Sequence, residues 1–165
     1  MDPSSMLAVI RHYFAEEVKE SWIFIITGLL ALNAGWWLWR SQSAFKHALW
    51  PLATVALIQM AVGGAIVWRT PSQTARLEAQ LAADAPAFKA AETGRLLRVL
   101  DAFRFYKLAE IALILTAIGL ALFLPQNAVA RGWALGLLLQ ASLMLAADLV
   151  AEHRVQAYLE AIARL

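Results

Sequence analysis

The sequence has 165 residues, of which 61% are hydrophobic and only 16% are charged, with a formal net charge of +2. Soluble domains are typically about 45–50% apolar and about 25% charged, so this composition excludes a disordered chain and argues against an ordinary soluble domain. The lack of cysteine excludes thiol catalysis, disulfides and thiolate metal sites. The mild net charge gives no support for binding to nucleic acid.

Four apolar blocks are each long enough to cross a membrane. A helix rises about 1.5 Å per residue, so each block covers a hydrocarbon core of about 30 Å. Because lipid offers no hydrogen-bond partner to the backbone, each spanning block must be helical. The predicted spans are residues 21–39, 47–68, 106–124 and 127–150. The expected fold is an all-α integral membrane protein, with a bundle of four transmembrane helices in one domain over residues 1–165.

Tryptophan and the basic residues indicate how the bundle lies in the membrane. All seven tryptophans fall at the ends of the predicted spans, as in the aromatic belts of the headgroup zone. Eleven Lys and Arg residues lie on the side of the termini, and three, Arg40, Lys46 and Arg131, lie on the other side. The positive-inside rule then places both termini in the cytoplasm. Because the alanine-rich composition is compatible with a GC-rich bacterium, we expect a bacterial inner membrane.

The first segment outside the spans, residues 1–20, is predicted to be an amphipathic cytoplasmic helix. Its apolar residues recur at helical spacing, and the helix is expected to lie on the membrane surface before span one. These residues are Met6, Ile10, Tyr13, Phe14 and Val18.

The connection between the second and third spans, residues 70–105, is predicted to be helical and cytoplasmic. Breaks are expected at Thr70-Pro71-Ser72 and at Asp84-Ala85-Pro86. Beyond the second break, span three should extend as one helix into the cytoplasm. Residues 151–165 should form a cytoplasmic tail helix.

Charged pairs at i,i+3 spacing along this long helix should stabilise its surface weakly. They are Glu92–Arg95, Asp101–Arg104 and Lys107–Glu110.

Two acidic residues lie inside the predicted spans, about one turn from the cytoplasmic boundary. An acidic side chain within a membrane is costly, so Glu110 and Asp148 are candidates for an ion or proton site if they face each other. Alternatively, they pair with Lys107, Arg69 or Arg104 at the same interface, or reach water by snorkelling.

Three amide side chains, Asn33, Gln59 and Gln140, lie in span interiors and could share one layer. They either form hydrogen bonds between helices or build a small polar site that extends the acidic pair. Small residues form helix-contact stripes that include Gly28, Gly63, Gly132 and Gly136. These stripes serve packing within the chain or, alternatively, an oligomer interface.

Basic residues near the cytoplasmic boundary are candidates for contact with anionic headgroups or with a partner, since each well-placed cation contributes about 1 kcal/mol. They are Arg69, Arg95, Arg98, Arg104 and Lys107.

The sequence contains no recognisable catalytic constellation, metal motif or cofactor motif, and no family signature. We therefore expect no metal or cofactor. The favoured hypothesis is a non-enzymatic membrane protein that binds partner proteins or lipids, as an accessory subunit or a homo-oligomer. The alternative is a small proton or cation channel or carrier that uses Glu110 and Asp148.

Overall fold

The computed structural model describes residues 3–165, and within them the fold is entirely helical. A short 3₁₀ helix, η1, precedes the second of four long helices. The helices are α1 (Pro3–Arg40), η1 (Lys46–Ala48), α2 (Leu49–Ala83), α3 (Ala85–Phe123) and α4 (Ala128–Ala163). The predicted all-α fold is therefore confirmed for these residues, and all four long helices are long and apolar enough to cross a membrane.

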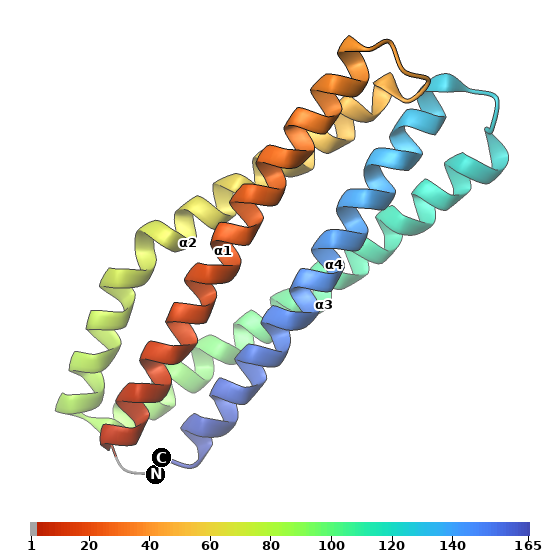
Figure 1. The fold of residues 1–165 in the computed structure, drawn as a ribbon. Coiled ribbons are helices and arrows are strands. Elements are labelled where there is room, and N and C mark those ends of the chain that lie inside the picture. Colours follow the sequence, from red (N-terminus) through yellow and green to blue (C-terminus); the bar gives the residue numbers. More distant parts are fainter. Residues whose placement is uncertain (1–2) are drawn as a thin grey trace.

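The helices are arranged as two antiparallel hairpins, α1 with α2 and α3 with α4 (Figure 1). The start of α1 and the C-terminus lie at the same end as the α2–α3 turn, and we call this the terminal end. The opposite end carries the α1–α2 and α3–α4 connections, and we call it the loop end. Helices of 35 to 39 residues are about 53 to 59 Å long, well beyond a hydrocarbon core of about 30 Å. Part of the bundle must therefore extend out of the membrane.

One of the two predicted breaks in the connection is found. α2 ends at Ala83 and α3 begins at Ala85, with Asp84 between them in an extended conformation. The Asp84 carboxylate accepts a hydrogen bond from the backbone N–H of Ala87 at 2.9 Å, and Pro86 stands in the first turn of α3. Both features favour a helix start. From there α3 continues as one helix to Phe123, as expected.

The other predicted break is wrong, because Pro71 lies inside α2. Figure 1 shows α2 bending near the middle of its length instead of ending. Proline removes one backbone hydrogen bond and bends a helix, but packing on both sides can hold the helix together. Here the preceding Thr70 is buried, and its hydroxyl donates to the Ile66 carbonyl at 2.7 Å.

The N-terminal segment also differs from the prediction in what its apolar face contacts. Residues 3–20 are helical but are continuous with the first span, and residues 1–2 lie outside the described part of the chain. The apolar face expected to lie on the membrane is instead buried inside the protein, where Met6, Ile10 and Phe14 are almost fully covered. The covering residues come from the other three helices.

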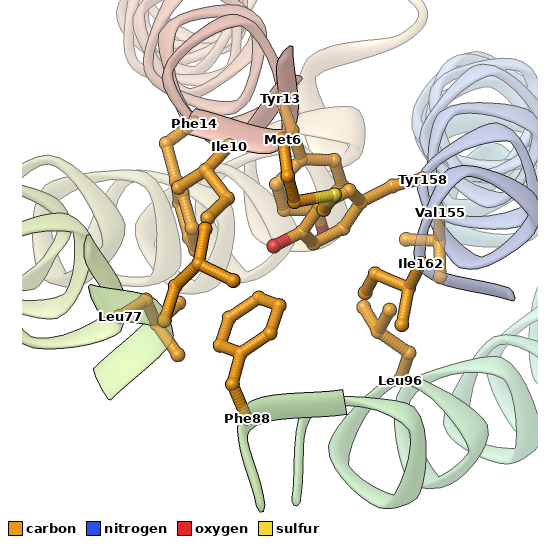
Figure 2. Close-up of a cluster of buried hydrophobic side chains, with 11 residues drawn as sticks. Met6, Ile10, Tyr13, Phe14, Leu77, Phe88, Leu96, Val155, Tyr158 and Ile162 are labelled. Carbon is orange, nitrogen blue, oxygen red and sulfur yellow. The ribbon is translucent and has the colours of Figure 1, made fainter. Parts of the chain in front are cut away.

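A compact apolar cluster closes the terminal end, and we call it the terminal core. Figure 2 shows side chains of all four helices pointing toward one another in this cluster. Its buried members are Met6, Ile10, Tyr13, Phe14, Leu77, Leu81, Phe88, Leu96, Val155, Tyr158 and Ile162. A buried aromatic and aliphatic core is what holds helices together where water surrounds a bundle. The terminal end is therefore built like a soluble four-helix bundle.

Toward the loop end the pattern reverses, and large apolar side chains face outward. Only 11% of the most apolar stretch of α3 is buried within the protein, against 39% of that of α4. All seven tryptophans are between 40% and 88% exposed, which suits aromatic belts facing headgroups. On α2, Trp50 and Trp68 are separated by about 27 Å of helix, close to the thickness of a hydrocarbon core.

Candidate functional site

The structure brings Glu110 of α3 and Asp148 of α4 together. Each residue is only 7% exposed, and their side chains interact with each other electrostatically. Glu110 and Ala117 are buried members of the stripe along which α3 packs against α4. The Glu110 Oε2 atom is buried and makes no hydrogen bond with any residue in 3–165. The predicted facing arrangement of the two acidic groups is therefore present.

The three cations suggested as partners for the acidic pair have other partners. Lys107 Nζ lies 2.5 Å from Glu152 Oε2 across the α3–α4 seam. Arg69 Nη2 lies 3.5 Å from Glu17 Oε1. The expected Lys107–Glu110 pair is therefore wrong, because the rotation of α3 against α4 turns Lys107 toward Glu152.

The two other i,i+3 pairs on α3 are present. Arg104 Nη1 lies 3.4 Å from Asp101 Oδ1, with both side chains exposed. Arg95 Nη2 lies 2.6 Å from Glu92 Oε1.

Two facing carboxyl groups in an apolar seam have a distinct chemistry. If both were ionised, each charge would raise the energy of the other in surroundings of low dielectric. Sharing one proton removes that repulsion, as in other coupled carboxyl pairs. The arrangement is therefore able to hold and release a proton, with the charge of Lys107 also acting on Asp148.

Two of the three predicted amide residues form an interhelical network deeper in the bundle. Gln59 Nε2 donates to the Phe24 carbonyl and to the Thr27 hydroxyl, each at 2.8 Å. Gln140 Nε2 donates to Gln59 Oε1 at 3.4 Å. The network joins α1, α2 and α4, and Thr27 was not predicted to take part because a lone threonine is common in apolar helices.

Asn33 does not belong to this layer, and the expectation that it would is wrong. It is exposed, and its Nδ2 donates to the carbonyl of Leu29 in its own helix at 2.8 Å. The reason is helical phase, since six residues separate Asn33 from Thr27 and turn it about 120° around α1.

The four glycines predicted at helix contacts all pack within the chain. Gly28 and Gly63 lie at the α1–α2 interface, and a Cβ on Gly63 would come within 2.8 Å of the Ser21 carbonyl oxygen. Gly132 and Gly136 bring α4 against the start of α2, and a Cβ on Gly132 would come within 2.8 Å of the Ala48 nitrogen. These positions are filled by the protein itself, so they do not form an oligomer interface.

The basic residues proposed for headgroup or partner contact divide into two groups. Arg98 is exposed, and Arg69 and Arg104 remain more than half exposed although each has an acidic neighbour. Lys107 and Arg95 are mostly covered, by Glu152 and by the terminal core respectively. The predicted headgroup contact of Arg95 is therefore not supported, because its guanidinium points into the bundle.

A buried polar cluster lies beside the terminal core, and the sequence did not reveal it. Glu92 is 2% exposed and accepts two hydrogen bonds from Arg95, at 2.6 and 2.8 Å. The rings of Tyr13 and Tyr158 stack with centroids 4.2 Å apart. The Arg154 guanidinium lies over the Tyr13 ring at 5.3 Å and pairs with Glu20. The i,i+3 spacing of Glu92 and Arg95 was the available signal, but spacing alone does not say that the pair is buried.

Burial changes the acid–base behaviour of this cluster. It raises the pKa of the Tyr158 phenol and of the Tyr13 phenol, because an ionised phenolate would be poorly solvated there. Burial opposes the charge on Arg95, but the hydrogen bonds and charge of Glu92 outweigh it and raise the pKa of Arg95. The cluster therefore has neutral phenols and a charged Arg95 at neutral pH.

Within residues 3–165, no group of three or more His, Asp or Glu side chains is placed to hold a metal ion. No protein-family model, curated protein or solved structure matches this chain. The function is therefore argued from the arrangement of these residues, with the Glu110–Asp148 pair as the candidate ion site and the outer face of α3 as the candidate contact surface.

Proposed function

We propose that this is a non-enzymatic membrane protein that acts by binding partner proteins or lipids, as an accessory subunit or in a homo-oligomer. The observation that carries the proposal is the exposure of α3 across the membrane, where only 11% of its most apolar stretch is buried. α3 contacts α4 along a narrow stripe marked by Glu110 and Ala117. Most of its circumference is free to contact another membrane helix.

The internal polar groups support the same proposal. Gln59 and Gln140 are engaged with other helices, and Lys107 is paired with Glu152. These groups stabilise the bundle and leave its outer surfaces for recognition. The exposed cations Arg69, Arg98 and Arg104 fit contact with anionic headgroups on the side we assign to the cytoplasm of a bacterial inner membrane.

Site-specific photocrosslinking in native membranes tests this proposal. A crosslinking residue at Leu108 or Leu115 samples the face of α3 opposite the α4 seam, since Leu108 lies about 200° around the helix from Glu110 and Leu115 about 200° from Ala117. Leu30 of α1 is the matched control, because Leu30 and Leu115 are both 63% exposed. A protein adduct of defined mass is expected from α3 and not from Leu30.

The mass of the adduct distinguishes an accessory subunit from a homo-oligomer. A mass of twice the chain would identify a second copy, and another mass would identify a different protein. Adducts with lipid alone at Leu108, Leu115 and Leu30 alike would refute protein binding through α3.

The second candidate function is a proton or cation channel or carrier. The specific observation that favours it is the buried Glu110–Asp148 pair with its unpaired Glu110 oxygen. Protein in sealed liposomes should then carry a proton or cation flux. Glu110→Gln or Asp148→Asn should reduce this flux, and Asp101→Asn should not, since Asp101 is exposed and distant from the seam. Liposomes that stay sealed with folded protein would rule this function out.

A further inference from the structure

A groove of about 390 Å³ opens between α3 and α4 at the loop end. Its walls are apolar and include Ala117, Ala121 and Leu122 of α3 and Leu138 of α4. Phe45, from the connection between α1 and α2, closes one side. Along α4 the lining runs from Arg131 to Leu138, which corresponds to about 10 Å of helix. The groove is thus an elongated apolar slot, within the size range typical of small-molecule sites.

One charged residue lines this apolar groove. Arg131 lies in the first turn of α4, and its Nε atom is buried without a hydrogen-bond partner in the described part of the chain. Arg131 also forms no ion pair within residues 3–165. A buried guanidinium N–H without an acceptor is costly, and an anionic group supplied from outside would remove that cost.

The charge distribution of the loop end points to an anion as the ligand. The sequence has no acidic residue between Glu20 and Glu78 or between Glu110 and Asp148. Both connections at the loop end fall in these stretches, so no carboxylate of the chain is available there to neutralise Arg131. The positive end of the α4 dipole is at the same place and adds to the attraction.

We propose that this groove binds an anionic membrane lipid. One acyl chain occupies the apolar slot, and the acidic group of the head pairs with the Arg131 guanidinium. Arginine forms forked, charge-assisted hydrogen bonds with phosphate oxygens, which suits this role. A second copy of the chain is a poorer occupant, since its loop end carries the same unneutralised cations. The site lies at the opposite end of the bundle from Arg69, Arg98 and Arg104.

Native mass spectrometry of the whole, delipidated protein tests the proposal. Phosphatidylglycerol and phosphatidylcholine with identical acyl chains are added back separately, and inorganic phosphate is added alone. One phosphatidylglycerol should bind about tenfold more tightly than phosphatidylcholine, because the choline cation of phosphatidylcholine is repelled by Arg131 and phosphatidylglycerol has no such cation. Phosphate alone should give no adduct, because it cannot fill the groove.

Substitutions test the head and the chain of the lipid separately. Arg131→Gln should weaken phosphatidylglycerol binding about tenfold, whereas Arg98→Gln, at an exposed cation of the terminal end, should not. Ala121→Phe should fill the groove and also reduce binding. Ala112→Phe is its control, since nine residues place Ala112 on the opposite face of α3. The melting temperature of each variant checks that it is folded.

Three results would overturn the proposal. Equal binding of the two lipids would show that the headgroup charge is not recognised. Unchanged binding in folded Arg131→Gln and Ala121→Phe would place the lipid elsewhere. A dimer mass that survives delipidation and is lost in Ala121→Phe would show that a second copy fills the groove.

Discussion

Individual residues in this bundle determine how closely its helices approach. Gly132 and Gly136 lie one turn apart on α4, and each faces the start of α2 with no room for a further carbon atom. Small residues let helix backbones come together where dispersion, and not the hydrophobic effect, drives association in lipid. The close packing of α4 against the start of α2 at the loop end therefore requires the absence of side chains at these two positions.

Replacing Gly132 by alanine should destabilise the protein. The new Cβ would lie 2.8 Å from the backbone nitrogen of Ala48, and backbone cannot move aside easily. Overpacking of this kind costs about 1–3 kcal/mol. The free energy of unfolding in mixed micelles measures the change.

Gly64→Ala is the control for this measurement. Its Cβ would meet no heavy atom within 4 Å, so the higher helix propensity of alanine should stabilise α2 or leave it unchanged. Equal effects of Gly132→Ala and Gly64→Ala would contradict the close approach of α4 and α2.

Among the helical elements, α3 begins directly after the end of α2 at a residue that caps it. Asp84 accepts a hydrogen bond from the Ala87 N–H at the positive end of α3. Pro71, by contrast, bends α2 but does not end it.

Asp84→Ala should lower the free energy of unfolding by about 1 kcal/mol, within the usual range for loss of an N-cap. Asp101→Ala is the matched control, because Asp101 is exposed and its pair with Arg104 should contribute less than about 1 kcal/mol. Thermal and denaturant unfolding of both variants measure the difference. A larger loss in Asp101→Ala than in Asp84→Ala would argue against the cap.

Taken as a whole, the bundle has two regions that differ in where their large apolar side chains lie. The terminal core buries apolar side chains as soluble proteins do, whereas the helices toward the loop end expose leucine and isoleucine. Polar pairs that include Glu17–Arg69, Lys107–Glu152 and Glu20–Arg154 lie between these regions. These pairs lie near the ends of the four predicted spans on the side of the termini.

The buried tyrosines of the terminal core should make the whole protein less stable at alkaline pH. Unfolded tyrosine ionises near pH 10, whereas burial raises the pKa of Tyr13 and Tyr158 in the folded protein. Above pH 10 the unfolded chain therefore releases protons that the folded chain retains. The free energy of unfolding should fall by about 1.4 kcal/mol per pH unit for each buried phenol.

Lysine titrates in the same pH range as tyrosine. Comparing the native protein with Tyr158→Phe separates the contribution of the phenol from that of the lysines. Above pH 10, the free energy of unfolding should fall less steeply with pH in Tyr158→Phe, because this variant has one buried phenol fewer. The two proteins should have parallel profiles below pH 10. Parallel profiles above pH 10 as well would show that Tyr158 is solvated in the folded state.

Much of the candidate site could be predicted from the sequence, but not its pairings. Glu110 and Asp148 stood out because an acidic side chain is costly in an apolar helix, and the structure brings them together. Gln59 and Gln140 were found by the same reasoning. Lys107 and Asn33 were misassigned because spacing along one helix does not give the rotation of that helix against its neighbours.

The amino-acid sequence alone was enough to predict an all-α protein with four apolar helices, a helix boundary at Asp84 and tryptophans near the ends of the apolar stretches. These features follow from local composition and helix periodicity, which need no knowledge of other segments. The packing of the helices, by contrast, brings the apolar face of residues 3–20 into a shared core and turns Arg95 inward. The packing of the helices also places Arg131 at the border of an apolar groove, where it has no counter-ion within residues 3–165. These outcomes depend on which helix faces which, and a helix turned by 100° presents a different set of side chains to its partner.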